Sequence, residues 1–156
     1  MKLIDTGSKL TEKALSEFEE QFSIQLPYDY KSFMLKNNGG TPVGNWGFDF
    51  IESDTVNKTS SLIHYFGVIY EEETYEVDDL KAGYIALLSS EQIPDTLMPI
   101  ADDPFGNGIF LSVAGDDYGK VYFGNHELED PITGYLIMSE IAESFSKFID
   151  SCYEIT

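Results

Sequence analysis

The spacing of apolar residues changes partway along the chain, from intervals of three and four to alternation, and this change restricts the possible folds. Leu15, Phe18 and Phe22 lie three and four residues apart, which is typical of one face of an α-helix. From Trp46 to Phe50, apolar residues occupy every second position, which predicts a strand with one face on a core. A chain that starts with helices and continues in strands favours an α+β fold.

Two helices are expected before this change. Thr11 is suited to cap the first one, because its hydroxyl can accept a hydrogen bond from an amide of the first turn. The second is expected to start at Pro27. Its apolar stripe is formed by Tyr30, Phe33 and Met34. The sequence from Asn37 to Gly40 should end this helix, because asparagine and glycine tolerate left-handed backbone, and Pro42 prevents it from resuming.

The rest of the chain predicts further strands and two more helices. The strand candidates are residues 62–70, 97–100, 108–113, 120–124 and 135–138, and residues 52–60 are expected to form a polar loop. One helix is expected to carry Leu80, Tyr84, Leu87 and Leu88 on one side. A final helix, capped by Ser139, is expected to bury Ile141, Phe145, Phe148, Ile149 and Cys152. Together these elements predict a single α+β domain over residues 1–156, with a mostly antiparallel (mixed) sheet bracketed by N-terminal helices and a C-terminal helix.

The chain is strongly acidic. It has 28 acidic residues and nine basic ones, all lysine, which gives a formal net charge of -19. This exceeds the magnitude of ~2–8 that keeps a small domain soluble. Such a field repels phosphate backbones and anionic lipids and attracts cationic surfaces. Direct binding of nucleic acid or membrane is therefore not expected, whereas clustered carboxylates can occupy a basic protein site that normally holds phosphates. Adaptation to an acidic or salt-rich proteome is the alternative explanation of the charge.

The expected location is the cytoplasm. No apolar run reaches the ~18–20 residues of a membrane span, and the first residues lack the pattern of a signal peptide. The lone Cys152 has no partner for an internal disulfide, which suits a reducing compartment.

Patterns typical of phosphate and metal sites are incomplete. Gly39 and Gly40 follow a helix instead of opening one, so they do not form a phosphate-binding loop. A calcium loop counted from Asp103 would place Phe105 and Ala114 at positions that need oxygen ligands. A turn is the favoured interpretation of this segment.

Acid–base patterns are incomplete as well. His126 and Glu127 could form a pair, but no nucleophile or orienting group stands at a recognisable position. The adjacent acids at 102–103 and 116–117 could form a glycosidase pair, which works only at fixed separations in a cleft. Adjacent acids in glycine-rich sequence are more typical of turns. We therefore expect no catalytic activity, no cofactor and no metal ion.

Three sequence blocks, in order along the chain, are similar to the SUKH superfamily. The first is Leu26-Pro27-Tyr28-Asp29-Tyr30-Lys31-Ser32-Phe33 with Asn38-Gly39-Gly40. The second runs from Pro99 to Asp103, through Gly106-Asn107 and residues 115–123, to His126-Glu127, and the third covers residues 141–149. The superfamily includes the yeast cell-wall assembly regulator and many bacterial immunity proteins. The resemblance implies an α+β domain whose bacterial members commonly bind and neutralise toxins of polymorphic secretion systems, many of them nucleases.

The leading hypothesis is thus an immunity protein that neutralises a cognate toxin, such as a nuclease, through an acidic surface. A regulatory protein-binding scaffold of the yeast type is the alternative, and an unrecognised hydrolase is a remote third. The residues expected to face a basic toxin domain are Glu71, Glu72, Glu73, Asp78, Asp79, Asp102, Asp103, Asp116 and Asp117, with Trp46 or Tyr70 as an aromatic anchor. No family pattern is recognised between Trp46 and Leu97, so partner specificity is expected to reside there.

Overall fold

The secondary structure agrees in kind and order with the predicted α+β class. The computed structural model describes residues 1–156. Its helices are α1 (Glu12–Phe22), α2 (Tyr28–Lys36), α3 (Leu80–Ser89) and α4 (Phe145–Ser151). Its strands are β1 (Leu3–Ile4), β2 (Thr41–Pro42), β3 (Asn45–Ile51), β4 (Lys58–Leu62), β5 (Tyr65–Phe66), β6 (Leu97–Asp102), β7 (Gly108–Ser112), β8 (Val121–Glu129), β9 (Leu136–Ala142) and β10 (Tyr153–Ile155).

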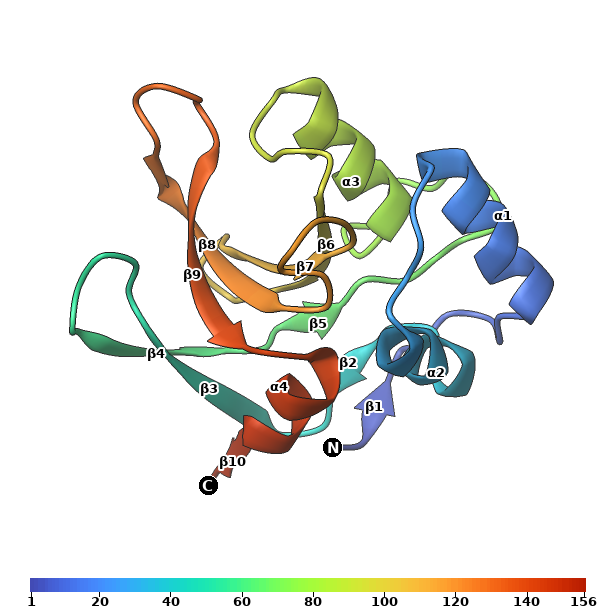
Figure 1. Cartoon of the computed structure of the whole chain (residues 1–156). Coiled ribbons are helices and arrows are strands. Elements are labelled where there is room, and N and C mark those ends of the chain that lie inside the picture. The colour runs from blue at the N-terminus through green and yellow to red at the C-terminus, as the bar shows by residue number, and fades with distance from the viewer.

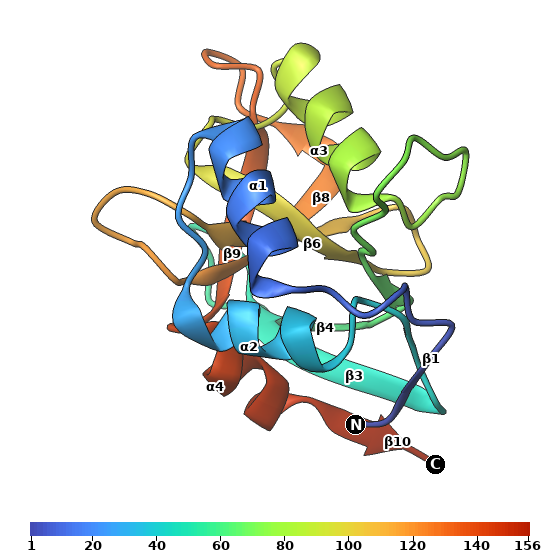
Figure 2. The same ribbon diagram turned by 90° about the vertical axis from the view of Figure 1, so that its right-hand side faces the viewer.

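The strands form three antiparallel sheets. The largest has the order β5-β6-β7-β8-β9, the second is β10-β3-β4, and β1 pairs with β2. Figure 1 shows the five-stranded sheet above the three-stranded one, with α1 and α3 beside the first and α4 beside β3 and β10. The view in Figure 2 places α1 and α3 in front of the five-stranded sheet and α2 next to α4.

The first two helices start and end close to where the sequence predicts. Thr11 caps α1, and its Oγ1 accepts a hydrogen bond from the Ala14 amide at 3.1 Å. Pro27 is the N-cap of α2, one residue before the first helical position. The chain leaves α2 at Asn37 in extended conformation. The predicted change from helix to strand is therefore confirmed.

Two glycines let the chain leave α2 in close contact with β5. Gly39 and Gly40 have φ values of 63° and 117°, in the left-handed region. A Cβ at Gly39 would overlap the backbone carbonyl of Gly67. Gly40 exchanges backbone hydrogen bonds with Phe66, at 3.1 Å and 2.8 Å. Glycine is needed here for both the backbone conformation and the approach of the two segments.

Aromatic side chains connect the helices to both large sheets. Tyr30 of α2 lies 5.2 Å from Phe145 of α4, measured between ring centroids. Phe148 of α4 lies 5.6 Å from Phe48 of β3. These residues belong to one cluster of 26 buried apolar residues that includes Phe66 of β5. The short α4 thereby joins the N-terminal helices to the three-stranded sheet.

The predicted start of the last helix was wrong. Ser139 lies in β9, and its Oγ accepts a hydrogen bond from the Ser53 amide at 2.9 Å. Ser144 caps α4 instead, accepting from the Lys147 amide at 3.1 Å. Ile141 is thus a strand residue. A short apolar run fits a strand as well as a helix, and pairing with β8 decides in favour of the strand.

Several strand boundaries also differ from the prediction. Residues 58–60, expected in a polar loop, begin β4 and pair with β3. The run 62–70 is mostly irregular: Leu62 ends β4, and Tyr65 and Phe66 form β5. No sequence pattern predicted β1, β2 or β10. Each is two or three residues long, so its pairing depends on the partner strand more than on its own composition.

Gly39→Ala should lower the free energy of unfolding by more than about 1 kcal/mol, because left-handed strain adds to a backbone overlap. Gly119→Ala is the control, since Gly119 also has positive φ but a Cβ there would meet nothing within 4 Å. Urea unfolding of both variants measures the difference. Equal losses would contradict the close approach at Gly39.

Phe148→Ala should lower the free energy of unfolding by ~3–5 kcal/mol, because the side chain is 0% exposed and packs among other rings. Phe105→Ala removes the same atoms at a residue that is 67% exposed, and should change stability by less than about 1 kcal/mol. Thermal unfolding compares the two. A small loss for Phe148→Ala would show that α4 does not anchor the core.

Candidate protein-binding surface

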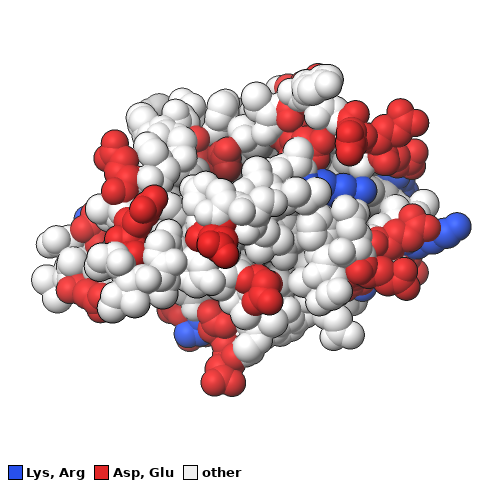
Figure 3. Space-filling view, turned by 90° about the horizontal axis from the view of Figure 1, so that it is seen from above, with Lys and Arg blue, Asp and Glu red and all other residues white.

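The ion pairs of the few lysines lie outside the acidic segment before α3, although Lys81 of α3 lines the same hollow as Glu71, Glu72 and Glu73. Five of the nine lysines pair with a carboxylate. The pairs are Lys13–Glu17, Lys31–Glu19, Lys58–Asp49, Lys120–Glu140 and Lys147–Glu143. None involves residues 70–79, which we call the acidic loop. Figure 3 shows acidic side chains spread over the face seen from above, with few lysines among them.

The acidic loop is held at both ends by its own side chains. Tyr70 donates a hydrogen bond from Oη to Asp78 Oδ1 at 2.7 Å, which closes the loop. Burial, together with this hydrogen bond, raises the pKa of Tyr70 to about 12, so the phenol remains a donor at neutral pH. Between these two residues, Glu71, Glu72 and Glu73 are exposed. The loop therefore presents three adjacent carboxylates from a fixed base.

Asp79 faces inward and caps α3. Its Oδ1 accepts a hydrogen bond from the Ala82 amide at 3.1 Å, and its Oδ2 accepts from Thr74 Oγ1 at 3.1 Å. The residue is only 7% exposed. A carboxylate at a helix N-terminus is stabilised by the helix dipole. Asp79 thus positions the acidic loop against α3, and its carboxylate is not available to a partner.

Asp102 lies next to the acidic loop although it comes from β6. Its Oδ2 accepts a hydrogen bond from Tyr65 Oη at 2.6 Å, and the same phenol lies 3.0 Å from the Val77 carbonyl oxygen. Burial raises the pKa of the Asp102 carboxyl. A groove of about 320 Å³ between α3 and the five-stranded sheet is lined by Asp78 and Asp102, among other residues. The structure therefore brings these two predicted site residues together.

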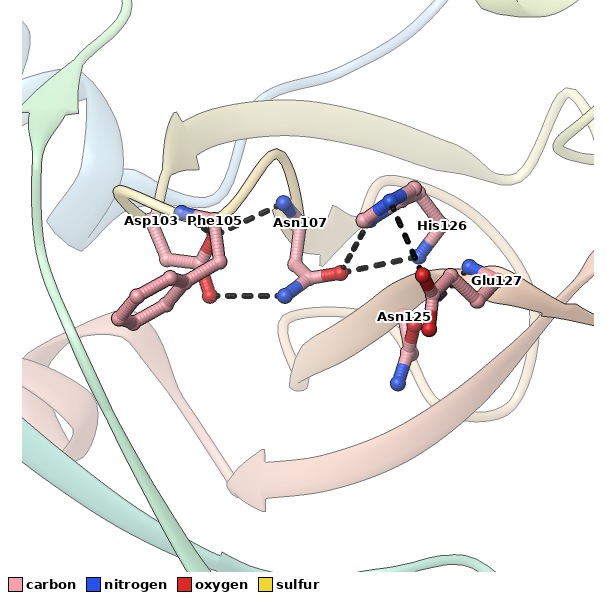
Figure 4. A network of polar contacts seen from close by, with 6 residues as sticks. All are labelled: Asp103, Phe105, Asn107, Asn125, His126 and Glu127. Carbon is pink, nitrogen blue, oxygen red and sulfur yellow. Dashed lines mark hydrogen bonds and ion pairs between the residues drawn. The ribbon is translucent and has the colours of Figure 1, made fainter.

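Asp103 has a different environment from its neighbour. It is 3% exposed, and its Oδ1 accepts hydrogen bonds from the amides of Phe105 and Asn107 at 2.9 Å and 2.8 Å. Its Oδ2 accepts from Asn107 Nδ2 and from Ser61 Oγ. Figure 4 shows this carboxylate enclosed by the turn that it stabilises. Asp103 shapes the loop 103–107, and its carboxylate is not available to a partner.

The pair His126-Glu127 forms part of the same network. Asn107 Oδ1 accepts a hydrogen bond from the His126 amide at 3.0 Å and lies 2.7 Å from His126 Nδ1 (Figure 4). Since Oδ1 is only an acceptor, Nδ1 must carry a proton. Glu127 is 4.0 Å from His126 Nε2 and half of the imidazole side chain is exposed. This arrangement braces the irregular part of β8 against the loop 103–107.

The remaining predicted site residues lie apart from the acidic loop. Asp116 is exposed in the β7–β8 turn. Burial alone would raise the pKa of Asp117, but hydrogen bonds from Tyr122 and Ser112 hold it below its usual value. Trp46 lies in the three-stranded sheet and donates from Nε1 to the Val43 carbonyl at 3.0 Å. The structure thus places Asp102 next to the acidic loop, which includes Tyr70. Asp116, Asp117 and Trp46 lie apart from this loop.

Two features of this surface were missed in the sequence. Tyr65 bonds to Asp102 across 37 positions, which no local pattern indicates. Gly83 lies inside α3 on its groove side, and a Cβ there would meet nothing within 4 Å. A glycine inside a helix lowers its stability, so this residue was a usable signal.

Comparison with known proteins places the chain in a family. Residues 9–151 match the SMI1 / KNR4 family (SUKH-1), and the chain belongs to this family. It is also similar to the SPbeta prophage-derived uncharacterized protein YokK of Bacillus subtilis (strain 168). The two are 31% identical over 157 residues, which cover 95% of this chain and 79% of that protein. The resemblance noted in the sequence is confirmed.

The structure contains neither a membrane-spanning helix nor a cluster of metal ligands. No helix combines the length and the apolar character that crossing a membrane requires. No group of three or more His, Cys, Asp or Glu side chains is arranged to hold a metal ion.

Replacing Glu71, Glu72 and Glu73 together by glutamine should leave the free energy of unfolding within about 0.5 kcal/mol of the wild type, or raise it, because these carboxylates are exposed and have no lysine partner. Asp79→Ala should lower it by ~0.5–2 kcal/mol, because α3 loses its cap. Urea unfolding at low salt measures both. A marked loss in the triple variant would mean that the three glutamates serve the fold.

Proposed function

We propose that the chain is an immunity protein that binds a basic toxin domain, such as a nuclease, in the cytoplasm and neutralises it. The observation that carries the proposal is the acidic loop. Its three glutamates are exposed, have no lysine partner, and stand on a base fixed by Tyr70 and Asp78. A rigid cluster of like charges on a folded surface favours a partner of opposite charge.

The negative charge of the acidic loop also indicates which activity the uninhibited partner would have. A protein that acts on nucleic acid presents a basic site to bind phosphates. Carboxylates on a fixed loop can occupy that site, because they carry the same charge as the phosphates. The proposed surface consists of the acidic loop, Tyr70 as its aromatic residue, and Asp102 beside it. Asp116, Asp117 and Trp46 would contact a partner only if the interface extended beyond this region.

Family membership supports a protein-binding role without specifying the partner. The SUKH-1 family is generally made of immunity and regulatory domains, and the similar Bacillus protein is described as prophage-derived. A regulatory scaffold would bind a protein as well, so the sign of the partner's charge and the effect of binding on its activity separate the two roles. An immunity protein must abolish the activity of its partner.

The test first asks whether the gene immediately upstream of this chain encodes a basic domain, and then uses that domain, prepared as an inactive variant, as the partner. Its association rate with this chain should fall severalfold or more between low and physiological salt, because screening shortens the range of attraction to ~8 Å, while dissociation should change less. Glu72→Lys should slow association further. Cells that express the active domain should be rescued less well by this variant.

Asp150→Lys is the matched control, because it makes the same change of charge at an exposed residue of α4, on another side of the molecule. It should change the association rate much less than Glu72→Lys. An association rate that is indifferent to salt and to Glu72→Lys would contradict the proposal. Equal effects of the two substitutions would show that net charge, and not the acidic loop, controls the encounter.

A further inference from the structure

The groove beside α3 is lined mostly by apolar groups and glycines. Leu80 and Leu87 of α3 line it, together with the ring of Phe110. Gly108 and Gly124 pair across β7 and β8 and also line the groove. A Cβ at either glycine would collide with the Phe110 ring, so only glycine fits at these two positions. The groove has a volume of about 320 Å³, which lies in the range of ~300–1,000 Å³ that is usual for ligand pockets.

The helix also leaves this groove open. Gly83 lies on the groove side of α3, where any other residue would add atoms, and a Cβ would meet nothing within 4 Å. The glycine is exposed, so the groove is accessible from solvent. Unfilled space between a helix and a sheet loses packing contacts that larger side chains would supply. The groove is therefore a cavity that an occupant could fill without moving the fold.

One end of the groove is acidic. Asp78 and Asp102 both line it, and no lysine does; His126 is the only basic residue among the lining side chains. Each of these carboxylates has one oxygen engaged by a tyrosine: Asp78 Oδ1 by Tyr70, and Asp102 Oδ2 by Tyr65. Tyr65 has one hydroxyl proton, so it cannot donate fully to both Asp102 Oδ2 and the Val77 carbonyl oxygen, which lie 2.6 Å and 3.0 Å from Tyr65 Oη. A cation at this end of the groove would balance the negative charge of the two carboxylates.

We propose that this groove takes a lysine side chain of the basic protein partner. The aliphatic part would lie along Leu80 and Leu87, and the ammonium group would meet Asp78 and Asp102. Arginine fits less well, because its planar fork prefers two free oxygens of one carboxylate, whereas each of these carboxylates has one oxygen engaged. An ammonium group can use single oxygens from different residues. The inference rests on the proposed function and names the residue type that the acidic surface captures.

The experiment does not require the toxin. The probe is Nα-acetyl-lysine N-methylamide, added to the ¹⁵N-labelled full chain while amide resonances are followed by NMR. The amides of Gly83, Gly108 and Gly124 should shift in a saturable manner, with a dissociation constant in the millimolar range. The norleucine analogue, which lacks the ammonium group, should bind at least tenfold more weakly. Equal shifts with both probes, or shifts that never saturate, would overturn the proposal.

Substitutions locate the binding site. Gly83→Leu fills the open space on the helix and favours helical backbone, so the fold should be retained while lysine binding is lost. Ser89→Leu adds the same side chain at an exposed position of α3 outside the groove and should leave lysine binding unchanged. Asp102→Asn should weaken it at least tenfold. Thermal unfolding confirms that each variant is folded, and retained binding in Gly83→Leu would overturn the inference.

The two proposals can fail separately. If the basic domain associates in a salt-dependent manner but lysine causes no saturable shift, the groove is not the lysine site and only this inference is wrong. If lysine binds in the groove but no basic domain binds the chain, the inference about the groove holds and the immunity function is wrong.

Discussion

The buried amide of Asn38 connects the parts of the molecule on which the candidate surface depends. Its Nδ2 donates to the carbonyls of Ser8 and Ile69 at 2.9 Å and 2.8 Å, and its Oδ1 accepts from the Ile69 amide at 2.8 Å. The N-terminal segment, the end of α2 and the segment after β5 thus meet at one side chain. A buried polar group with all these partners satisfied specifies one arrangement, since any shift leaves a donor or acceptor unpaired. Ile69 immediately precedes the acidic loop, so this contact also fixes where the loop begins.

The acidic residues of this chain serve two physical purposes that composition cannot separate. Asp79 and Asp103 are buried acceptors that cap a helix and close a turn, and their cost of desolvation is offset by several hydrogen bonds. Glu71, Glu72 and Glu73 have no such role in the fold, and they repel one another. Exposed like charges that contribute nothing to the core are typical of a binding surface, where unfavourable features are retained for function. The division between these two groups explains why the surface is smaller than the list of acids in the sequence.

What the sequence predicted well was governed by local chemistry. Thr11 caps a helix through its own hydroxyl, and Gly39 and Gly40 adopt the left-handed conformation for which glycine is needed, so both were recognisable from neighbouring residues. Ser139 was misplaced because a short apolar run suits either a helix or a strand, and only pairing with β8 decides. The burial of Asp103 and the contact between Tyr65 and Asp102 depend on residues about 40 positions away. The three sequence blocks that are similar to the SUKH superfamily indicated the fold. They did not indicate these contacts, because each contact forms only when the sheet is assembled.

A protein partner is proposed to dock on the acidic loop and the adjacent groove of α3. Hydrogen–deuterium exchange of this chain, alone and in complex with the basic domain, tests it most directly. Exchange in the complex should be slower in residues 70–83 and around Asp102, with little change in β3, β4 and β10. Protection confined to the three-stranded sheet, with none in residues 70–83, would contradict the account.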